Sequence, residues 1–338
     1  MTAPLPLIFV DPFPRTEAMV FTPDTEAALR SMGRLVTHFG ARAPDALVES
    51  VLDEVAIIIG QTAMDRDRLD RAANLKAIVN VKANWEPNID YAHAQAKGVQ
   101  VLTVAPVMGP PVAEYCLGQA IALARGLPRA DAAFRKGSER YGGEGNRAAY
   151  SLFGAPVGLI GYGNLGRALV PLLRAFTSRI AVHDPGLSDA YLESCDLEPM
   201  ALDALLSSRR VVFVLAGVTA QNEGFLGADR LARMPEGASL VLASRAEVVD
   251  FEALMAEADS GRLRVAVDVF PDEPVPAHAP WRDTRNALFS AHLAGGLAST
   301  YAAMRSMIVD DVRQILRGLP PMRLQRAEPR LAAMARSR

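Results

Sequence analysis

The sequence has little cysteine, almost no net charge and no long apolar run, and each shortage excludes a class of protein. Only two of the 338 residues are cysteines, Cys116 and Cys195, and their spacing fits neither a C-x-x-C motif nor a metal centre. The formal net charge of −2 argues against a nucleic-acid or membrane-surface partner. No apolar run comes near the length of about 18 residues that a membrane helix needs, and no leader-like segment opens the chain. We therefore expect a cytoplasmic protein that binds no nucleic acid, no membrane and no metal.

What the chain does contain is typical of a globular protein with a substantial core. Hydrophobic residues make up 50% of the sequence and charged residues 22%. The length is enough for two domains. In the first third, short apolar stretches alternate with helical periodicity, which predicts a small parallel α/β unit. The expected strands are residues 5–10, 56–60, 75–81 and 99–104, and the expected helices are residues 25–32, 66–73 and 89–97.

Four further segments complete the outline. Residues 112–125 form a long, largely apolar pattern, a helix that could join two domains or face a partner subunit. Residues 135–150 are rich in glycine and charge and predict an exposed loop. A last helix is expected to end at Leu316 and return the chain to the N-terminal unit. The basic residues 320–338 predict a loosely held tail or a short helix.

The central stretch of the chain is a short apolar run followed by a glycine motif and a helical pattern. Residues 155–160 predict a buried strand, and residues 167–175 predict a helix. Between them, the spacing Gly-x-Gly-x-x-Gly occurs in the context that a dinucleotide site requires. The three glycines would permit a tight turn, a close pyrophosphate and close helix packing, and the helix N-terminus would offer free N–H groups to the phosphates. The expected cofactor residues here are Gly161, Tyr162, Gly163, Asn164, Leu165 and Gly166.

An acidic residue at the end of the next strand strengthens this interpretation. Residues 179–183 form an apolar run that ends at Asp184, about 20 residues after the glycine motif, where a Rossmann unit carries its ribose-binding acid. A carboxylate there accepts hydrogen bonds from the ribose hydroxyls and repels a 2′-phosphate. Asp184 therefore favours NAD over NADP, although a residue that merely caps the strand is the alternative.

Polar residues follow three later strands of what we expect to be a six-stranded, doubly wound sheet. Arg245 follows the strand at 239–242, and His292 follows the strand at 287–290. The strand at 265–269 contains Asp268 and is followed by Glu273. Ligands of open α/β sheets bind outside the carboxyl ends of the strands, so these side chains should meet at the cofactor edge. The further cofactor contacts expected at this edge are Ala216, Ala243, Asp268, His292 and Gly295.

The three polar residues suit the reduction of a keto acid. His292 has the intrinsic acidity to deliver a proton to a carbonyl oxygen. Glu273 could orient its imidazole, and the planar fork of Arg245 matches a substrate carboxylate. Asp268 is more consistent with a cofactor ligand, such as one for the nicotinamide amide. Taken singly, three of these residues have a structural alternative. His292 could be a hydrogen-bonded structural histidine, Glu273 could lie in a solvated turn, and Arg245 could be a surface charge.

These motifs together resemble the D-isomer specific 2-hydroxyacid dehydrogenase family over most of the chain. The resemblance lies in residues 161–166 with 183–185, residues 243–250, residues 266–274 and residues 290–295. It implies that Arg245 binds the substrate carboxylate, that His292 is the general acid/base and that Glu273 is its partner. It also implies two Rossmann-like doubly wound domains, with an NAD-binding domain at 109–296 inserted into a discontinuous, flavodoxin-like substrate domain at 1–108 and 297–338. A homodimer with an interface on the NAD-binding domain is implied as well.

The sequence departs from the family pattern in the loop at residues 82–87. Trp85 stands where a glycine is expected, and Pro87 cannot donate an N–H. In addition to Arg245 and His292, the expected substrate-binding residues are Asn84 and Trp85, which would donate through their backbone N–H groups. Trp85 and Lys82 indicate either an unusual substrate with an extra anionic or polar group, or simply a packing residue and a solvated charge. Two smaller departures are Ala246 after the arginine and the residues 215–219, which lack a common family His and Pro.

The sequence as a whole predicts an NAD-dependent oxidoreductase that transfers a hydride between nicotinamide and C2 of a small 2-hydroxy or 2-keto acid. One alternative is a formate- or phosphite-type dehydrogenase of the same superfamily, which the altered loop at residues 82–87 motivates. The other is an NAD(H)-sensing, corepressor-like binding protein, because such proteins retain the same Arg, Glu and His. The chain lacks the long disordered extensions that would carry partner motifs in such a sensor.

Overall fold

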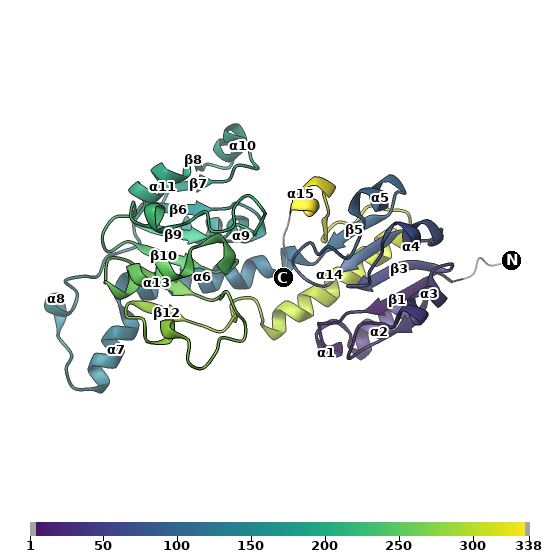
Figure 1. Cartoon of the computed structure of the whole chain (residues 1–338), viewed down its shortest axis with the longest axis horizontal. Coiled ribbons are helices and arrows are strands. Elements are labelled where there is room, and N and C mark those ends of the chain that lie inside the picture. The colour runs from purple at the N-terminus through teal and green to yellow at the C-terminus, as the bar shows by residue number, and fades with distance from the viewer. Residues whose placement is uncertain (1–4, 335–338) are drawn as a thin grey trace. The chain divides into compact units, whose positions relative to one another are not determined.

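The computed structural model describes residues 5–334 and divides the chain into two compact α/β units (Figure 1). The first unit combines the residues up to Met108 with those from Gly296 onward, and the second runs from Gly109 to Gly295. Each unit has its own, mainly parallel sheet with helices on both faces. This confirms the predicted α/β class.

The first unit contains a six-stranded sheet in the order β13-β5-β4-β3-β1-β2. Its strands are β1 (Leu7–Asp11), β2 (Arg34–Thr37), β3 (Val55–Gly60), β4 (Ala77–Asn80), β5 (Gln100–Thr103) and β13 (Gln325–Arg326). Its helices are α1 (Glu17–Val20), α2 (Pro23–Arg30), α3 (Asp45–Val51), α4 (Arg66–Arg71), α5 (Tyr91–Ala96), α14 (Ala298–Leu316) and α15 (Pro329–Met334), with a 3₁₀ turn η1 at Ala105–Met108. One core joins the sheet to α2 and α14, and the other joins it to α3, α4 and α5.

The first unit differs from the expectation at α1, β2 and α3 and in its C-terminal segment. The edge strand β2 and the helix α3 were not predicted, because β2 is only partly buried and lacks a clear alternation. Of the two predictions for the C-terminal segment, the loose tail was wrong within the described residues and the short helix is confirmed: β13 pairs antiparallel with β5, and α15 follows it. The buried Asp311 of α14 explains this, because its carboxylate accepts hydrogen bonds from the backbone N–H groups of Met322, Arg323 and Leu324 at 2.7–2.9 Å.

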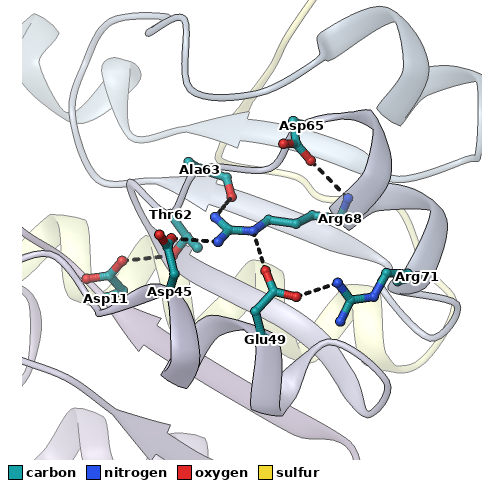
Figure 2. A network of polar contacts seen from close by, with 8 residues as sticks. All are labelled: Asp11, Asp45, Glu49, Thr62, Ala63, Asp65, Arg68 and Arg71. Carbon is teal, nitrogen blue, oxygen red and sulfur yellow. Dashed lines mark hydrogen bonds and ion pairs between the residues drawn. The ribbon is translucent and has the colours of Figure 1, made fainter.

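A polar network fastens α3 to α4 on the surface of the first unit (Figure 2). The Arg68 guanidinium donates to Asp45 at 2.6 Å and to Glu49 at 2.9 Å, and Arg71 also pairs with Glu49. Hydrogen bonds from Arg68 and then Arg71 hold the pKa of Glu49 below its ordinary value. All of these charges are satisfied within the network, so it serves packing of the two helices.

The second unit contains a seven-stranded parallel sheet in the order β12-β11-β10-β9-β6-β7-β8. Its strands are β6 (Val157–Ile160), β7 (Ile180–His183), β8 (Glu198–Pro199), β9 (Val211–Val214), β10 (Ser239–Leu242), β11 (Arg264–Val267) and β12 (Ala287–Phe289). The six-strand expectation missed β8, whose two residues pair with β7 at the edge and are too short to show periodicity. The strand order reverses between β6 and β9, so the crevice for a ligand opens at the carboxyl end of β6.

Helices cover both faces of this sheet. They are α6 (Gly109–Arg125), α7 (Leu127–Arg135), α8 (Gly142–Gly145), α9 (Asn164–Leu173), α10 (Asp189–Ser194), α11 (Leu202–Ser208), α12 (Ala228–Leu231) and α13 (Phe251–Asp259), with 3₁₀ turns η2 (Ala246–Val248) and η3 (Pro280–Asp283). The long helix α6 packs against α9 within this unit, and Cys116 lies in the resulting core. Within residues 5–334, no helix combines the length and apolarity needed to cross a bilayer.

Candidate active site

The glycine turn between β6 and α9 has the geometry of a phosphate-binding turn. Gly161 has φ +95°, and a Cβ there would lie 2.7 Å from the backbone N of Ala216. A Cβ at Gly166 would lie 2.8 Å from the Gly161 carbonyl oxygen. By contrast, a Cβ at Gly163 would meet nothing within 4 Å, so the backbone is open on that side. The turn therefore needs glycine for its fold at two positions and leaves room for a ligand at the third.

The helix after this turn presents its N-terminus to the same opening. α9 begins at Asn164, three residues earlier than expected, so Asn164 and Leu165 lie in its first turn. Its N-cap residue is Gly163, which has no side chain to satisfy the first N–H groups. The N-terminus of a helix and the positive end of its dipole suit a pyrophosphate.

Asp184 lies beside this turn because β6 and β7 are neighbours in register. Ile160 pairs with His183, which brings the next residue of each strand together. The carboxylate accepts a hydrogen bond from the backbone N–H of Tyr162 at 2.8 Å and another from that of Gly186 at 3.0 Å. Two carboxylate oxygens have about four acceptor sites, so capacity remains for ribose hydroxyls. The residues present therefore fit a dinucleotide at this edge.

His292 and Glu273 form a hydrogen-bonded pair in the loops after β12 and β11. The Glu273 carboxylate lies 2.7 Å from Nδ1 of His292, and its other oxygen accepts the backbone N–H of Phe270 at 3.0 Å. Glu273 is thus oriented by its own loop. In the described part of the chain, no residue hydrogen-bonds Nε2 of His292, and the side chain is 51% exposed. The imidazole is therefore held at one nitrogen and accessible at the other.

Arg245 follows β10 and is mostly buried without an ion-pair partner. Its Nη1 donates to the Ser244 carbonyl at 2.6 Å, and among the described residues no carboxylate lies within ion-pair distance. Burial lowers the pKa of this guanidinium, an effect that the nearby Glu247 and Glu273 partly offset. A buried cation without a counter-ion is unfavourable, so an anionic ligand would stabilise it.

Asp268, expected as a cofactor ligand, is bound to the turn that carries His292. It is buried, and its carboxylate accepts the backbone N–H groups of Leu293 at 2.8 Å and Ala294 at 3.0 Å. Ser290 donates to the same carboxylate, and Tyr115 of α6 hydrogen-bonds Ser290. Sequence reasoning missed Ser290 and Tyr115. Ser290 occupies the same position after its strand as Asp268 does after the neighbouring strand, and that signal was available.

The remaining expected cofactor residues stand at strand ends of the same sheet. Ala216 lies against Gly161 two residues after β9, and Ala243 directly follows β10. Gly295 ends the turn after His292 and is the last residue of the second unit. Asn84 and Trp85, in contrast, belong to the first unit. Within the described residues, no cluster of three His, Cys, Asp or Glu side chains is arranged to hold a metal ion.

Trp85 is a packing residue of the first unit. Its ring meets that of Tyr91 edge-on with the centroids 6.1 Å apart and packs on the core beneath α5. Within the part of the chain that the structure describes, nothing accepts a hydrogen bond from the backbone N–H of Asn84 or Trp85. The packed indole therefore fixes the loop, while the backbone N–H groups of Asn84 and Trp85 stay available as donors.

Lys82 forms an ion pair with Glu86, so it is not simply a solvated charge. Glu86 is buried and also accepts a hydrogen bond from Gln61 Nε2 at 3.0 Å. Burial alone would raise the pKa of Glu86, but hydrogen bonds from Lys82 and Gln61 outweigh it, and the pKa lies below its ordinary value. The ionised carboxylate neutralises Lys82, which weakens the case for an additional substrate anion at this position.

Comparisons with known proteins agree with this geometry. A family model described as "D-isomer specific 2-hydroxyacid dehydrogenase, NAD binding domain" matches residues 117–294, more than half of the chain. The crystal structure of a phosphoglycerate oxidoreductase from Rhizobium etli is 40% identical, with a TM-score of 0.86, and the match covers 96% of this chain and 98% of that one.

Curated relatives are more distant. The D-3-phosphoglycerate dehydrogenase of Methanocaldococcus jannaschii is 27% identical over 281 residues, which are 81% of this chain and 52% of that protein. The hydroxypyruvate reductase of Thermotoga maritima is 29% identical over 275 residues, which are 79% of this chain and 85% of that protein. The chain thus spans about half the length of the first of these relatives.

Proposed function

Because the chain belongs to the D-isomer specific 2-hydroxyacid dehydrogenase family, we propose that it is an NAD-dependent dehydrogenase of a small 2-hydroxy or 2-keto acid. The observation that carries this proposal is the His292–Glu273 pair, which shares the carboxyl edge of one sheet with the mostly buried Arg245 and the glycine turn. The comparisons favour neither a formate- or phosphite-type enzyme nor a corepressor-like sensor.

The residues divide the chemistry between them. The glycine turn and Asp184 would hold the dinucleotide, whose nicotinamide would supply or accept the hydride at the substrate's C2. His292 gives a proton from Nε2 to the carbonyl oxygen in reduction and takes it back in oxidation, because Nδ1 is engaged by Glu273. Arg245 holds the substrate carboxylate in a bidentate pair. Asn84 and Trp85 of the first unit remain predicted backbone donors to the substrate, and nothing described accepts a hydrogen bond from their N–H groups.

Oxidation of NADH in the presence of a panel of keto acids tests this function. Glyoxylate, hydroxypyruvate and 3-phosphohydroxypyruvate sample one small acid, one with an added hydroxyl and one with a second anionic group. We expect turnover of at least one acid with NADH, and slower turnover with NADPH. Tight NADH binding without turnover of any acid in the panel would contradict a dehydrogenase and support the sensor instead.

The choice of NADH over NADPH is expected to depend on the charge of Asp184. Asp184→Asn keeps an acceptor for the Tyr162 N–H but removes the repulsion of a 2′-phosphate. We expect the ratio of kcat/KM for NADH to that for NADPH to fall by about tenfold or more, the effect of about 1.4 kcal/mol. Asp189→Asn, on the exposed first turn of α10, serves as the control and should leave the ratio unchanged.

We also propose a homodimer formed through the second unit. Helices α7 and α8 stand out from the strands of that unit and bury none of their residues (Figure 1). Leu127 and Phe134 of α7 are 51% and 64% exposed and lie two turns apart on one face. Light scattering should give twice the chain mass for the protein and for Leu319→Asp, an exposed apolar site in the first unit. It should give the chain mass for Phe134→Asp, and a monomeric parent protein would contradict the proposal.

A further inference from the structure

The turn that carries His292 has a backbone conformation that must be held in place. His292 has φ +54°, in the left-handed region that non-glycine residues adopt uncommonly. Such a conformation persists where surrounding contacts determine it, and relaxes where they are removed. The orientation of the imidazole toward Glu273 therefore depends on whatever fixes residues 291–294.

Asp268 supplies those contacts from the neighbouring strand. Its backbone carbonyl accepts the His292 N–H at 2.8 Å, and its carboxylate accepts the Leu293 and Ala294 N–H groups at 2.8 and 3.0 Å. Three successive backbone donors of the turn thus end on one buried residue. The position of the Asp268 carboxylate consequently sets the position of the turn.

The carboxylate is itself held from two further elements. Val267 of β11 pairs with Phe289 of β12, so Asp268 and Ser290 follow their strands side by side. Ser290 Oγ donates to Asp268 Oδ1 at 2.5 Å and also hydrogen-bonds the Tyr115 hydroxyl. This series of hydrogen bonds connects Tyr115 of α6 to the turn of His292, although Tyr115 lies 175 residues before Ser290 in the sequence.

The direction of each hydrogen bond between Tyr115, Ser290 and Asp268 follows from the number of protons that the two hydroxyl groups carry. An ionised carboxylate only accepts, so the single hydroxyl proton of Ser290 goes to Asp268. Tyr115 must then donate to Ser290. Burial, with the charge of Asp268 nearby, raises the pKa of Tyr115 to about 12, so the phenol keeps the proton that this arrangement needs.

We propose that Tyr115 and Ser290 are positioning residues for the acid–base step, acting through Asp268 on the turn that presents His292. The inference rests on the proposed role of His292. Without the Ser290 hydroxyl, the Asp268 carboxylate keeps its two backbone donors, Leu293 and Ala294, but loses its third donor, the one that ties it to the neighbouring strand and to α6. The carboxylate and the turn bound to it can then shift together, which moves His292 away from Glu273. Gly161 and Asp184 directly follow β6 and β7 and have no contact with these hydrogen bonds, so the NADH contacts expected at the glycine turn are retained.

The test is a set of variants at the two hydroxyls. We expect Ser290→Ala to lower kcat by about tenfold and Tyr115→Phe by about threefold, with KM for NADH within twofold of the parent protein. Because Tyr115 acts on Asp268 only through Ser290, the double variant should be no slower than Ser290→Ala. Ser290→Thr keeps the hydroxyl and should restore most of the rate.

Tyr150→Phe is the matched control, because it removes a 2.6 Å contact between Tyr150 and Ser239 at the opposite end of a strand in the same sheet. It should leave kcat unchanged. A second readout needs no turnover: the NMR signal of the His292 ring, identified by its loss in His292→Gln, should shift in Ser290→Ala but not in Tyr150→Phe.

The outcomes separate this inference from the proposed function. If His292→Gln abolishes turnover while the Tyr115 and Ser290 variants keep the parent kcat and the parent ring signal, the function stands and the positioning role is wrong. Losses that multiply in the double variant, or that Ser290→Thr does not restore, also overturn it. If His292→Gln itself retains turnover, the proposed role of His292 is wrong, and so is the inference that rests on it.

Discussion

Replacing His292 by glutamine is expected to lower kcat for keto-acid reduction by about a thousandfold, the middle of the range for losing a general acid. Glutamine retains a polar side chain of similar reach, but its amide cannot deliver a proton. The His292 Nε2 is the free nitrogen of a pair whose other nitrogen is bound to Glu273 at 2.7 Å, so no second described group is placed to replace it there. NADH affinity should change little, because the glycine turn lies on β6 and α9.

His278→Gln provides the matched control for this experiment. His278 is an exposed histidine in the loop that follows β11, outside the hydrogen-bonded pair. Its variant should keep the parent kcat and KM. Parent-level turnover in His292→Gln, measured with the same acid and NADH, would show that the proton comes from elsewhere and that the pair is structural.

The parts of the site that could be predicted from sequence are those that depend on local spacing. Gly166 is required by its contact with the Gly161 carbonyl within one strand–turn–helix unit, and Gly161 by its positive φ in the turn, so the spacing of the glycines carries the information. Arg245 and His292 could be placed because each follows a recognisable apolar strand. Parallel strands bring their carboxyl ends to one edge, and this rule is independent of loop detail.

The parts that could not be predicted depend on contacts between distant segments. Tyr115 sits in an apolar helical pattern, and nothing local indicates that its hydroxyl reaches Ser290. For the C-terminal segment the sequence left a loose basic tail and a short helix open, because the anchor of the segment is the buried Asp311 of another helix. For Trp85 the sequence left packing and substrate contact equally open, and the packing partner that it could not identify is Tyr91, on the helix after the loop.

Replacing Arg245 is expected to give the second large effect, chiefly on the substrate rather than the cofactor. Arg245→Ala removes the cation proposed to pair with the substrate carboxylate. Losing one partner of a buried ion pair costs about 3–5 kcal/mol, which corresponds to a fall of kcat/KM by a factor of about 150 to about 5,000. Most of the fall should appear as a higher KM for the keto acid, with KM for NADH nearly unchanged. Arg245→Lys should remain strongly impaired, because an ammonium cannot form the bidentate pair.

The mostly buried position of Arg245 also predicts a gain in stability from the same substitution. Its guanidinium lies near Glu247 and Glu273 but within ion-pair distance of no described carboxylate, and burial lowers its pKa. A charge kept partly out of water without a partner opposes folding, so the uncharged Arg245→Met should melt at or above the temperature of the parent protein while losing keto-acid turnover. Arg230→Met, which removes a half-buried residue paired with Asp203 at 3.3 Å, should keep full activity. A large fall in melting temperature for Arg245→Met would instead mean that Arg245 supports the fold and that the carboxylate is bound by another group.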